Sequence, residues 1–354
     1  MNDSNHSTDI ATRVQAAAEQ RTPLRIVGGG SKDFYGRACK GELLDLNGHR
    51  GVIDYEPSEL VITARSGTPL SAVEAVLAEQ GQMLAFDPPH FAAAATLGGT
   101  IACGLSGPRR PYTGAVRDFV LGVKVINGRG EALVFGGQVM KNVAGYDLSR
   151  LMAGALGTLG VLLDVSLKVL PIPPAEITLC RNAGVTQALD CFNEWAGQPL
   201  PLSAACFDGE RLYVRLSGTA QGVEQGRIRI GGDILPDGDD FWMSVREQHH
   251  PFFADERPLW RLSVPPASAP LDINGRWLVD WGGAQRWLST DAPAAEVRSA
   301  AARAGGHATL FRGGDRSASV FHELTPALAA LQRRVKAALD PAGILNPGRL
   351  YPDW

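Results

Sequence analysis

The sequence lacks the features that mark membrane-spanning, secreted or nucleic-acid-binding proteins. None of its apolar stretches approaches ~18 residues, the length that a bilayer-spanning helix requires. Residues 1–12 are polar and contain no apolar core of a secretory signal, so we expect a cytoplasmic chain. The formal net charge is −3, without a run of lysine or arginine. This balance predicts no basic patch for nucleic acid or for a membrane surface.

Metal-binding and disulfide patterns are also missing. The cysteine count is five, and no C-x-x-C occurs among Cys39, Cys103, Cys180, Cys191 and Cys206. An odd number of cysteines without this spacing predicts reduced thiols and neither an iron–sulfur cluster nor a zinc site. The seven histidines have no metal-ligand spacing either. We therefore expect no metal in this chain, and any metal cluster of the system would lie on a partner.

Two common nucleotide-binding motifs are absent, although a glycine-rich loop is present. G-x-G-x-x-G starting at Gly28 would need glycine where Asp33 stands, and no G-x-x-x-x-G-K-[ST] occurs. The short run Arg25–Val27 leads instead into Gly28-Gly29-Gly30-Ser31-Lys32, and Gly36 follows. Successive N–H donors, a hydroxyl and the missing Cβ atoms suit a diphosphate. The alternative is an ordinary tight turn.

A second glycine-rich stretch runs from Asp87 to Asp118 and is nearly free of charge before Arg109. Its glycines are Gly98, Gly99, Gly104, Gly107 and Gly114. Apolar residues such as Leu97 and Ile101 stand between them, whereas a solvated linker would be rich in serine and lysine. We interpret the stretch as a buried ligand cradle, in which glycine allows positive φ, close backbone approach and N–H groups directed at an anion. The alternative is a floppy loop.

Hydrophobic periodicity predicts helices and strands through the first half of the chain. The predicted elements are a helix at 9–20, strands at 24–27 and 60–64, a helix capped by Thr68 that starts at Pro69 and ends before Gly81, a hairpin of 119–126 and 131–135, and a strand at 161–169. In the last strand, apolar residues alternate with Asp164, Ser166 and Lys168, which predicts a half-buried strand. Prolines 171, 173 and 174 then break the pattern and predict a domain boundary.

The second half mixes strands and helices in the manner of an α+β domain with an antiparallel sheet. The predicted strands are 177–180, 203–207, 211–216, 260–264, 276–281 and 307–312, and the predicted helices are 186–196, 219–228 and 293–304. Residues 231–258 are polar and receive no assignment. A last helix at 326–339 carries Leu328, Leu331, Val335 and Leu339. A chain of 354 residues is long enough for two such domains.

Taken together, the motifs resemble the FAD-binding oxidoreductases of the vanillyl-alcohol oxidase and p-cresol methylhydroxylase (PCMH) type. The glycine-rich loop and the Ala95-Thr96-Leu97-Gly98-Gly99 segment are similar to that family's cofactor motifs. Arg117–Gly122 (Arg-Asp-Phe-Val-Leu-Gly), Gly157–Val161 (Gly-Thr-Leu-Gly-Val) and the closing Asp340–Arg349 follow the same pattern.

A narrower resemblance covers nearly the whole chain. Cys103–Pro111, Val139–Leu148 and Asp280–Ala284 look like the E-type FAD-binding subunits of bacterial glycolate oxidase, also called glycolate dehydrogenase. The resemblance implies an α+β fold that is not a Rossmann fold. It consists of a PCMH-type FAD-binding domain of two α+β subdomains and a smaller antiparallel α+β cap domain. We expect the FAD-binding domain at 1–172, the cap or substrate domain at 173–325, and a segment at 326–354 that returns to the FAD domain.

The resemblance also implies which residues bind FAD. They are Val27, Gly28, Gly29, Gly30, Ser31, Lys32, Gly36, Pro88, Thr96, Leu97, Gly98, Gly99, Ala102, Cys103, Gly104, Gly114, Val116, Asp118, Gly157, Gly160, Val161, Asn346 and Arg349. Members of the family with covalent flavin commonly place a histidine within the first glycine loop, where this chain has Gly30-Ser31-Lys32. We therefore expect FAD without a covalent link.

The implied function is oxidation of glycolate to glyoxylate within a multi-subunit complex. Its partners would be a metal-site-bearing FAD subunit and an iron–sulfur subunit, and any association with a membrane would come through the complex. Whether this subunit oxidises a small 2-hydroxy acid itself or relays electrons is open. Two alternatives are a stand-alone flavin oxidase or dehydrogenase of another 2-hydroxy acid or alcohol, and a non-catalytic assembly subunit.

Candidates for catalysis are few. The weak candidates are His90, Arg110, Tyr146 and His307. A lone histidine is more often structural than catalytic, and Tyr146 equally suits a core position. Arg109 and Arg110 stand between Pro108 and Pro111, and such a guanidinium fork suits a carboxylate, a phosphate or an acidic patch on a partner.

Overall fold

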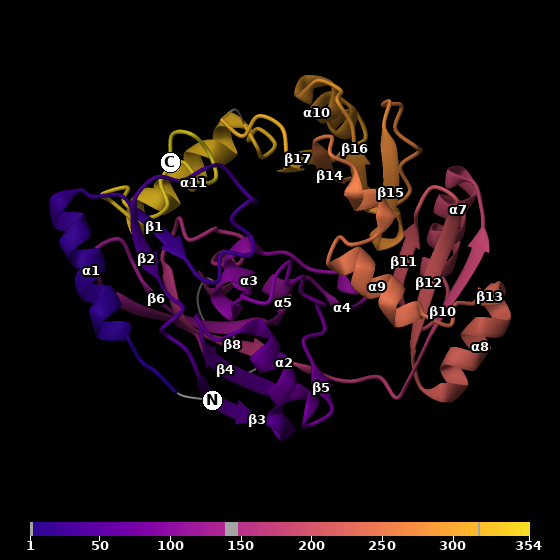
Figure 1. The fold of residues 1–354 in the computed structure, drawn as a ribbon, viewed down its shortest axis with the longest axis horizontal. Helices are drawn as coiled ribbons and strands as arrows, with labels where there is room; N and C mark the ends of the chain where they lie inside the picture. The colour runs from indigo at the N-terminus through magenta and orange to yellow at the C-terminus, as the bar shows by residue number, and fades with distance from the viewer. Residues whose placement is uncertain (1–2, 139–147, 318) are drawn as a thin grey trace. The chain divides into compact units, whose positions relative to one another are not determined.

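The computed structural model describes residues 3–138, 148–317 and 319–354. By its internal contacts the chain divides into two units (Figure 1). The first unit comprises Met1–Leu105, Ala115–Pro171 and Ser317–Trp354, and the second comprises Ser106–Gly114 and Ile172–Arg316. The predicted domain limits, after residues 172 and 325, remain a prediction. They differ from the units in Ser106–Gly114, which they leave in the first domain, and in residues 317–325, which they place in the cap domain.

Sheets of unequal size organise the first unit (Figure 1). Its elements are α1 (Ser7–Gln20), β1 (Leu24–Val27), β2 (Glu42–Asp45), β3 (Val52–Glu56), η1 (Pro57–Glu59), β4 (Val61–Arg65), α2 (Leu70–Ala78), β5 (Gln82–Met83), α3 (Leu97–Cys103), α5 (Val116–Phe119), β6 (Val120–Ile126), β7 (Ala132–Gly136), α6 (Leu148–Leu151), β8 (Val161–Lys168), β9 (Leu170–Pro171) and α11 (Pro326–Leu339). Five strands form an antiparallel sheet in the order β3-β4-β8-β6-β7, and β1 pairs in parallel with β2.

The predicted strand at 24–27 and the hairpin of β6 and β7 are confirmed. The prediction of a half-buried strand at 161–169 is wrong in one respect, because β8 lies between β4 and β6 with both faces largely buried. Its polar residues have partners: His49 Nε2 lies 3.3 Å from Asp164 Oδ1, and the hydroxyls of Ser166 and Thr63 lie 2.8 Å apart.

One helix prediction is wrong in its cap, and the prediction of the last helix is confirmed. The hydroxyl of Thr68 does not cap α2, since it accepts a hydrogen bond from the N–H of Gly51 (2.9 Å) and donates one to the carbonyl of the same residue. Helix α11 spans the predicted residues 326–339. Leu328 and Leu331 are 42% and 53% exposed, whereas Val335 and Leu339 pack against the core.

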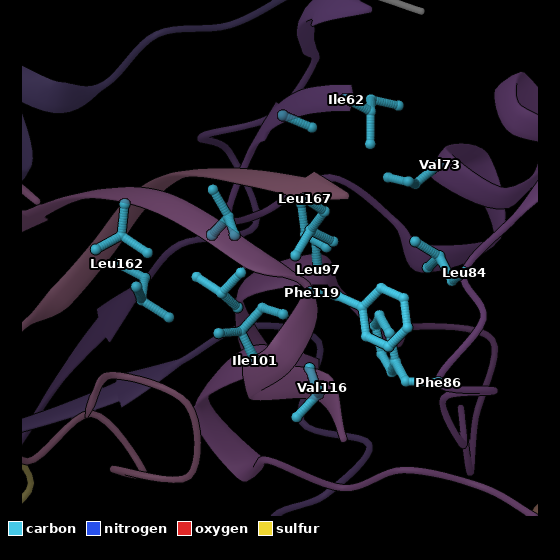
Figure 2. Packing of buried hydrophobic residues seen from close by; sticks show 14 of the residues in the cluster. Ile62, Val73, Leu84, Phe86, Leu97, Ile101, Val116, Phe119, Leu162 and Leu167 are labelled. Carbon is cyan, nitrogen blue, oxygen red and sulfur yellow. The ribbon is translucent and has the colours of Figure 1, made fainter. Parts of the chain in front are cut away.

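Two hydrophobic clusters fill the first unit. The larger one lies between the five-stranded sheet and helices α2, α3 and α5, and Figure 2 shows residues from all of these elements meeting there. In it Phe86 and Phe119 lie with ring centroids 5.6 Å apart. The smaller cluster joins α1, β1 and β2 with Ile344 and Leu345 of the C-terminal segment. The C-terminal segment therefore packs on the strand that leads into the first glycine loop.

An eight-stranded antiparallel sheet dominates the second unit, in the order β13-β10-β12-β11-β15-β16-β14-β17. The elements are α4 (Arg110–Thr113), β10 (Ala175–Asn182), α7 (Val185–Ala196), β11 (Leu202–Phe207), β12 (Arg211–Gly218), α8 (Ala220–Ile230), β13 (Asp233–Ile234), α9 (Gly238–Arg246), η2 (Pro251–Ala254), β14 (Leu259–Ser263), β15 (Arg276–Asp280), η3 (Trp281–Gly283), β16 (Gln285–Ser289), α10 (Ala294–Arg303) and β17 (His307–Arg312). The predicted antiparallel α+β class is confirmed for this unit, and the unassigned residues 231–258 contain β13, α9 and η2.

Across the described ranges, no helix combines the length and the apolar character that crossing a bilayer requires.

Candidate functional site

The first unit contains a cavity built around its two glycine-rich stretches. Its empty volume is about 820 Å³, including the part that opens to solvent. The residues that line it are Ile26, Val27, Gly28, Gly29, Gly30, Ser31, Lys32, Asp33, Leu46, Ser66, Thr96, Gly98, Gly99, Ala102, Cys103, Met152, Ala155, Leu156, Gly157, Gly160, Leu162, Asn346 and Arg349. Segments that are far apart in the sequence thus line a single cavity.

The first glycine loop presents unused backbone donors to this cavity. Strand β1 ends at Val27, and the chain continues without regular structure through Gly28, Gly29, Gly30 and Ser31. Within the described part of the chain, the N–H groups of these four residues donate no hydrogen bond. Gly30 has φ of +70°, a backbone conformation that glycine adopts without steric cost. Successive free N–H groups of this kind form an anion-binding concavity.

Neighbouring backbone and side chains require glycine at two positions of the loop. A Cβ on Gly28 would overlap the hydroxyl oxygen of Thr96, and a Cβ on Gly29 would overlap the carbonyl oxygen of Ala94. The two glycine-rich stretches therefore touch through these residues, and the loop is packed on one side while its N–H groups remain available on the other.

Two cationic side chains add positive charge to the cavity wall. Lys32 is only 6% exposed, and its Nζ donates to Ser31 Oγ (3.3 Å) and to the carbonyl of His90 (3.2 Å). Arg349 donates to the carbonyls of Arg37 (2.8 Å) and Asp33 (3.2 Å), and no carboxylate among the described residues pairs with it. The Asp33 carboxylate is paired with Arg25. The wall thus carries a net positive charge that suits a phosphate group.

The second glycine-rich stretch differs from the prediction. Residues 97–103 form helix α3, and the N–H groups of its first turn are already bonded: Leu97 to the carbonyl of Thr68, Gly98 to that of Ser66, and Gly99 to Thr96 Oγ1, over 2.9, 2.7 and 3.2 Å. Gly98 and Gly99 have no positive φ, unlike Gly104, which ends the helix with φ of +64°. The interpretation of the stretch as a source of N–H donors for an anion therefore does not hold at residues 97–99.

Close packing explains Gly98 instead. A Cβ at this position would lie 2.5 Å from the Cβ of Ser66, so only glycine lets α3 approach the end of β4. At Gly99 a Cβ would meet only Thr96 Oγ1, at 3.1 Å. These contacts place the first turn of α3 beside both β4 and the first glycine loop.

The C-terminal segment fastens two walls of the cavity through Asn346. Its Oδ1 accepts from the N–H of Ile26 (2.8 Å), and its Nδ2 donates to the carbonyl of Leu156 (2.7 Å). Behind it, Lys336 Nζ donates to the carbonyls of Thr158 (2.7 Å) and Leu345 (2.9 Å) and to Asp340 Oδ2 (2.5 Å). Because its amide is engaged within the protein, Asn346 holds the cavity in shape.

The cavity brings together most of the residues predicted to bind FAD. Those that line it are Val27, Gly28, Gly29, Gly30, Ser31, Lys32, Thr96, Gly98, Gly99, Ala102, Cys103, Gly157, Gly160, Asn346 and Arg349. Other predicted residues lie elsewhere in the first unit: Gly36 beside Arg349, Pro88 in the loop after β5, Gly104 at the end of α3, and Leu97, Val116 and Val161 in the hydrophobic clusters.

Two further predicted residues have structural surroundings of their own. Asp118 accepts a hydrogen bond from the N–H of Ala115 (2.8 Å) at the start of α5. Gly114 ends α4 in the second unit, with φ of +113°. Sequence reasoning missed several lining residues, namely Ile26, Asp33, Leu46, Ser66, Met152, Ala155, Leu156 and Leu162. Most are apolar and carry no motif that would distinguish them from core residues.

The weak catalytic candidates that the structure describes belong to different units. His90 belongs to the first unit, with Nε2 2.9 Å from Glu74 Oε2. Arg110 and His307 belong to the second unit, where the Arg110 guanidinium stacks on Trp281 at 4.4 Å and His307 begins β17. Tyr146, together with most of the Val139–Leu148 motif, lies outside the described residues. Residues 3–138, 148–317 and 319–354 contain no group of three His, Cys, Asp or Glu side chains arranged to hold a metal.

Arg109, the neighbour of Arg110, has partners within the second unit. Its Nη2 lies 2.5 Å from Glu176 Oε2, and its Nη1 donates to Ser217 Oγ over 3.3 Å. This arginine is buried and serves the packing of its unit.

Cys103 lies on the cavity wall of the first unit. Burial raises the pKa of its thiol from 9.0 to about 11.

Comparison with known proteins identifies the family. Residues 5–136 match the profile described as "FAD binding domain", and residues 284–350 match "FAD linked oxidases, C-terminal domain". Over 348 residues the chain is 47% identical to the glycolate oxidase subunit GlcE of Escherichia coli, an alignment that covers 98% of each protein. The chain belongs to the GlcE family of glycolate oxidase subunits.

This GlcE-family chain is also similar to a second glycolate oxidase subunit in sequence and to a solved oxidoreductase structure in fold. The glycolate oxidase subunit GlcD of Bacillus subtilis is 31% identical over 178 residues, which is 49% of this chain and 37% of that protein. The structure of p-cresol methylhydroxylase with bound substrate superposes with a TM-score of 0.72 at 16% identity, covering 98% of this chain and 87% of that one. The predicted PCMH-type fold and the predicted FAD cofactor are thereby confirmed.

The cavity fits FAD on its own geometry. Four free N–H groups and two cations suit the pyrophosphate, and the apolar residues Leu46, Met152, Leu156 and Leu162 suit ring surface. By its family this chain is an FAD-linked oxidoreductase, and the cavity is the candidate site for its cofactor.

Proposed function

We propose that the chain is the FAD-binding subunit of a multi-subunit glycolate oxidase, which oxidises glycolate to glyoxylate and passes the electrons through partner subunits to an acceptor. The observation that carries this proposal is the 47% identity to the E. coli glycolate oxidase subunit GlcE over 98% of both proteins. Identity of this extent supports the same role for this chain. So does the presence of the first glycine loop, residues 28–31, which we call the donor loop because of its free N–H groups.

When bound, FAD would supply the redox chemistry as an acceptor of hydride. The residues of this chain bind and orient it. Gly28, Gly29, Gly30 and Ser31 would donate N–H groups to the pyrophosphate, while Lys32 and Arg349 would balance its charge. Asn346 keeps β1, and with it the donor loop, at a fixed position relative to Leu156.

The cavity offers no suitable base for the oxidation of a 2-hydroxy acid. Among its described lining residues, the titratable side chains are Lys32, Asp33, Cys103 and Arg349. Asp33 is paired with Arg25, and the pKa of Cys103 is raised to about 11. Removal of the hydroxyl proton needs a base near the working pH or a metal, and a positioned base is typically worth ~10²–10⁴-fold in rate.

We therefore assign that task to the assembled complex. A metal-site-bearing FAD subunit would supply the metal that acidifies the substrate hydroxyl, and an iron–sulfur subunit would carry electrons away. The similarity to a protein named glycolate oxidase subunit GlcD supports the flavin partner. On this proposal the isolated chain is a poor glycolate dehydrogenase.

Anaerobic reduction of the flavin tests the proposal. The purified chain should show a flavin spectrum that bleaches slowly or not at all with glycolate, and addition of the two partner subunits should restore turnover. A chain that binds no flavin would favour the assembly-subunit alternative. Oxidation of glycolate by the lone chain at the rate of the complex would instead favour a stand-alone enzyme, with His90, His307 and Tyr146 as the first bases to replace.

A further inference from the structure

Ser66 is a buried hydroxyl on the cavity wall that has no partner. It directly follows β4 and is 1% exposed. Within the ranges that the structure describes, its Oγ makes no hydrogen bond. Buried side-chain hydroxyls are nearly always bonded, and leaving one unpaired typically costs ~1–3 kcal/mol. A ligand in the cavity would supply the missing partner.

The backbone of Ser66 is fixed, whereas its side chain is not. Its N–H donates to the carbonyl of Leu163 (2.7 Å), and its carbonyl accepts from the N–H of Gly98 (2.7 Å). The missing Cβ of Gly98 lets α3 pack against Ser66. No hydrogen bond holds the hydroxyl in one χ1 well, so it can turn toward the group that fills the cavity.

We infer that Ser66 binds FAD through a hydrogen bond from its hydroxyl to a polar atom of the cofactor. The inference rests on the proposed function only in so far as FAD occupies this cavity. It adds a cofactor ligand that lies outside both glycine-rich stretches. It also explains why a polar residue stands at a position that packing alone would give to alanine.

Thr100, on the neighbouring helix α3, offers a matched control. Its hydroxyl is also fully buried and, in the described part of the chain, unpartnered, but Thr100 does not line the cavity. Ser66→Ala and Thr100→Val each delete one buried hydroxyl with little change in shape. Only the first deletion should affect the cofactor.

The test is FAD affinity of the full chain, measured by flavin fluorescence quenching, together with thermal unfolding of the FAD-free protein. Ser66→Ala should raise the Kd of FAD on the order of 10-fold, and Thr100→Val should leave it unchanged. The Tm of the FAD-free Ser66→Ala protein should equal or exceed that of wild type, because an unpaired hydroxyl has been removed. Ser66→Cys, which keeps a weak donor, should give an intermediate Kd.

Two results would overturn the inference. One is a Ser66→Ala protein whose Kd for FAD stays within about 2-fold of wild type. The other is a fall in the Tm of the FAD-free protein, which would make the serine structural. Failure of the wild-type chain to bind FAD would overturn the cavity assignment as well, so the two failures are distinguishable.

Discussion

The two glycine-rich stretches look alike in sequence but work differently in the fold. In the first, residues 28–31 leave four N–H groups without a partner and face a cavity. In the second, residues 97–99 begin α3, and their N–H groups donate hydrogen bonds to Thr68, Ser66 and Thr96. One stretch leaves its N–H groups available to a ligand, and the other uses its N–H groups within the chain and allows close packing beside the cavity.

The difference shows that glycine content alone does not identify an anion site. The N–H groups of the first turn of a helix can be bonded within the chain, as in α3, where Thr96 caps the helix through its hydroxyl. The N–H groups of residues 28–31 have no acceptor within the described part of the chain. Free N–H groups, rather than glycine as such, are therefore the feature that makes the first stretch the candidate phosphate site.

The largest expected effect is at Gly29. A Cβ there would overlap the carbonyl oxygen of Ala94, so Gly29→Ala must displace the donor loop or the chain beside it. We expect the Kd of FAD to rise on the order of 100-fold or more, measured by equilibrium dialysis.

Gly184→Ala is the control for this substitution, because a Cβ at Gly184 meets no atom within 4 Å and its φ is −85°. The control protein should bind FAD like wild type. Normal FAD affinity of Gly29→Ala would show that the first stretch is not the donor loop.

A second prediction concerns the buried ion pair of Lys336 and Asp340, which lies behind Asn346. Lys336→Met leaves the buried Asp340 carboxylate without its cation, and loss of one member of a buried pair typically costs ~3–5 kcal/mol. We expect urea unfolding to show a drop of this size in the free energy of unfolding, with weaker FAD binding because Asn346 loses its support.

The double variant Lys336→Met/Asp340→Asn should recover part of the loss, since the unpaired charge is gone. An unchanged stability of the single variant would show that the pair does not hold the C-terminal segment in place.

The free N–H groups and the cavity position of the first stretch could be anticipated from the sequence because each of its features is local. A strand, three glycines and a serine are adjacent, and their chemistry does not depend on distant residues. The role that we propose for Ser66 could not be predicted in this way, since its place on the cavity wall depends on backbone contacts with the distant residues Leu163 and Gly98. Likewise, the helical state of residues 97–103 depends on Thr68 and Ser66 accepting hydrogen bonds from far along the chain.

Adjacent glycines of α3 give a third and smaller effect. Gly98→Ala places a Cβ 2.5 Å from that of Ser66, whereas Gly99→Ala meets only Thr96 Oγ1. Overpacking of this kind costs ~1–3 kcal/mol, so we expect Gly98→Ala to lower the free energy of unfolding by that amount and Gly99→Ala to lower it less. Equal losses in thermal unfolding would contradict the packing role of Gly98.

The smallest effect concerns Cys103 on the cavity wall. Burial raises its pKa from 9.0 to about 11, so its thiolate fraction at pH 9 is about one-hundredth rather than one half. Alkylation of Cys103 by iodoacetamide should therefore be slow at pH 9 and accelerate toward pH 11, followed by mass spectrometry of the peptide.

A protonated thiol is a poor nucleophile, which agrees with the expectation of non-covalent FAD. Acid precipitation of the holoprotein should release all of the yellow colour. Flavin retained on the pellet would contradict this expectation and make Cys103 the first attachment site to examine.

Hydrogen exchange of the backbone amides tests the central claim most directly, since it reads both glycine-rich stretches in one protein. Without FAD, the amides of residues 28–31 should exchange rapidly, and those of 97–99 should be protected by their bonds to Thr68, Ser66 and Thr96. Addition of FAD should slow exchange at 28–31 and leave 97–99 unchanged. Protection that appears at 97–99 while 28–31 continue to exchange freely would contradict the account.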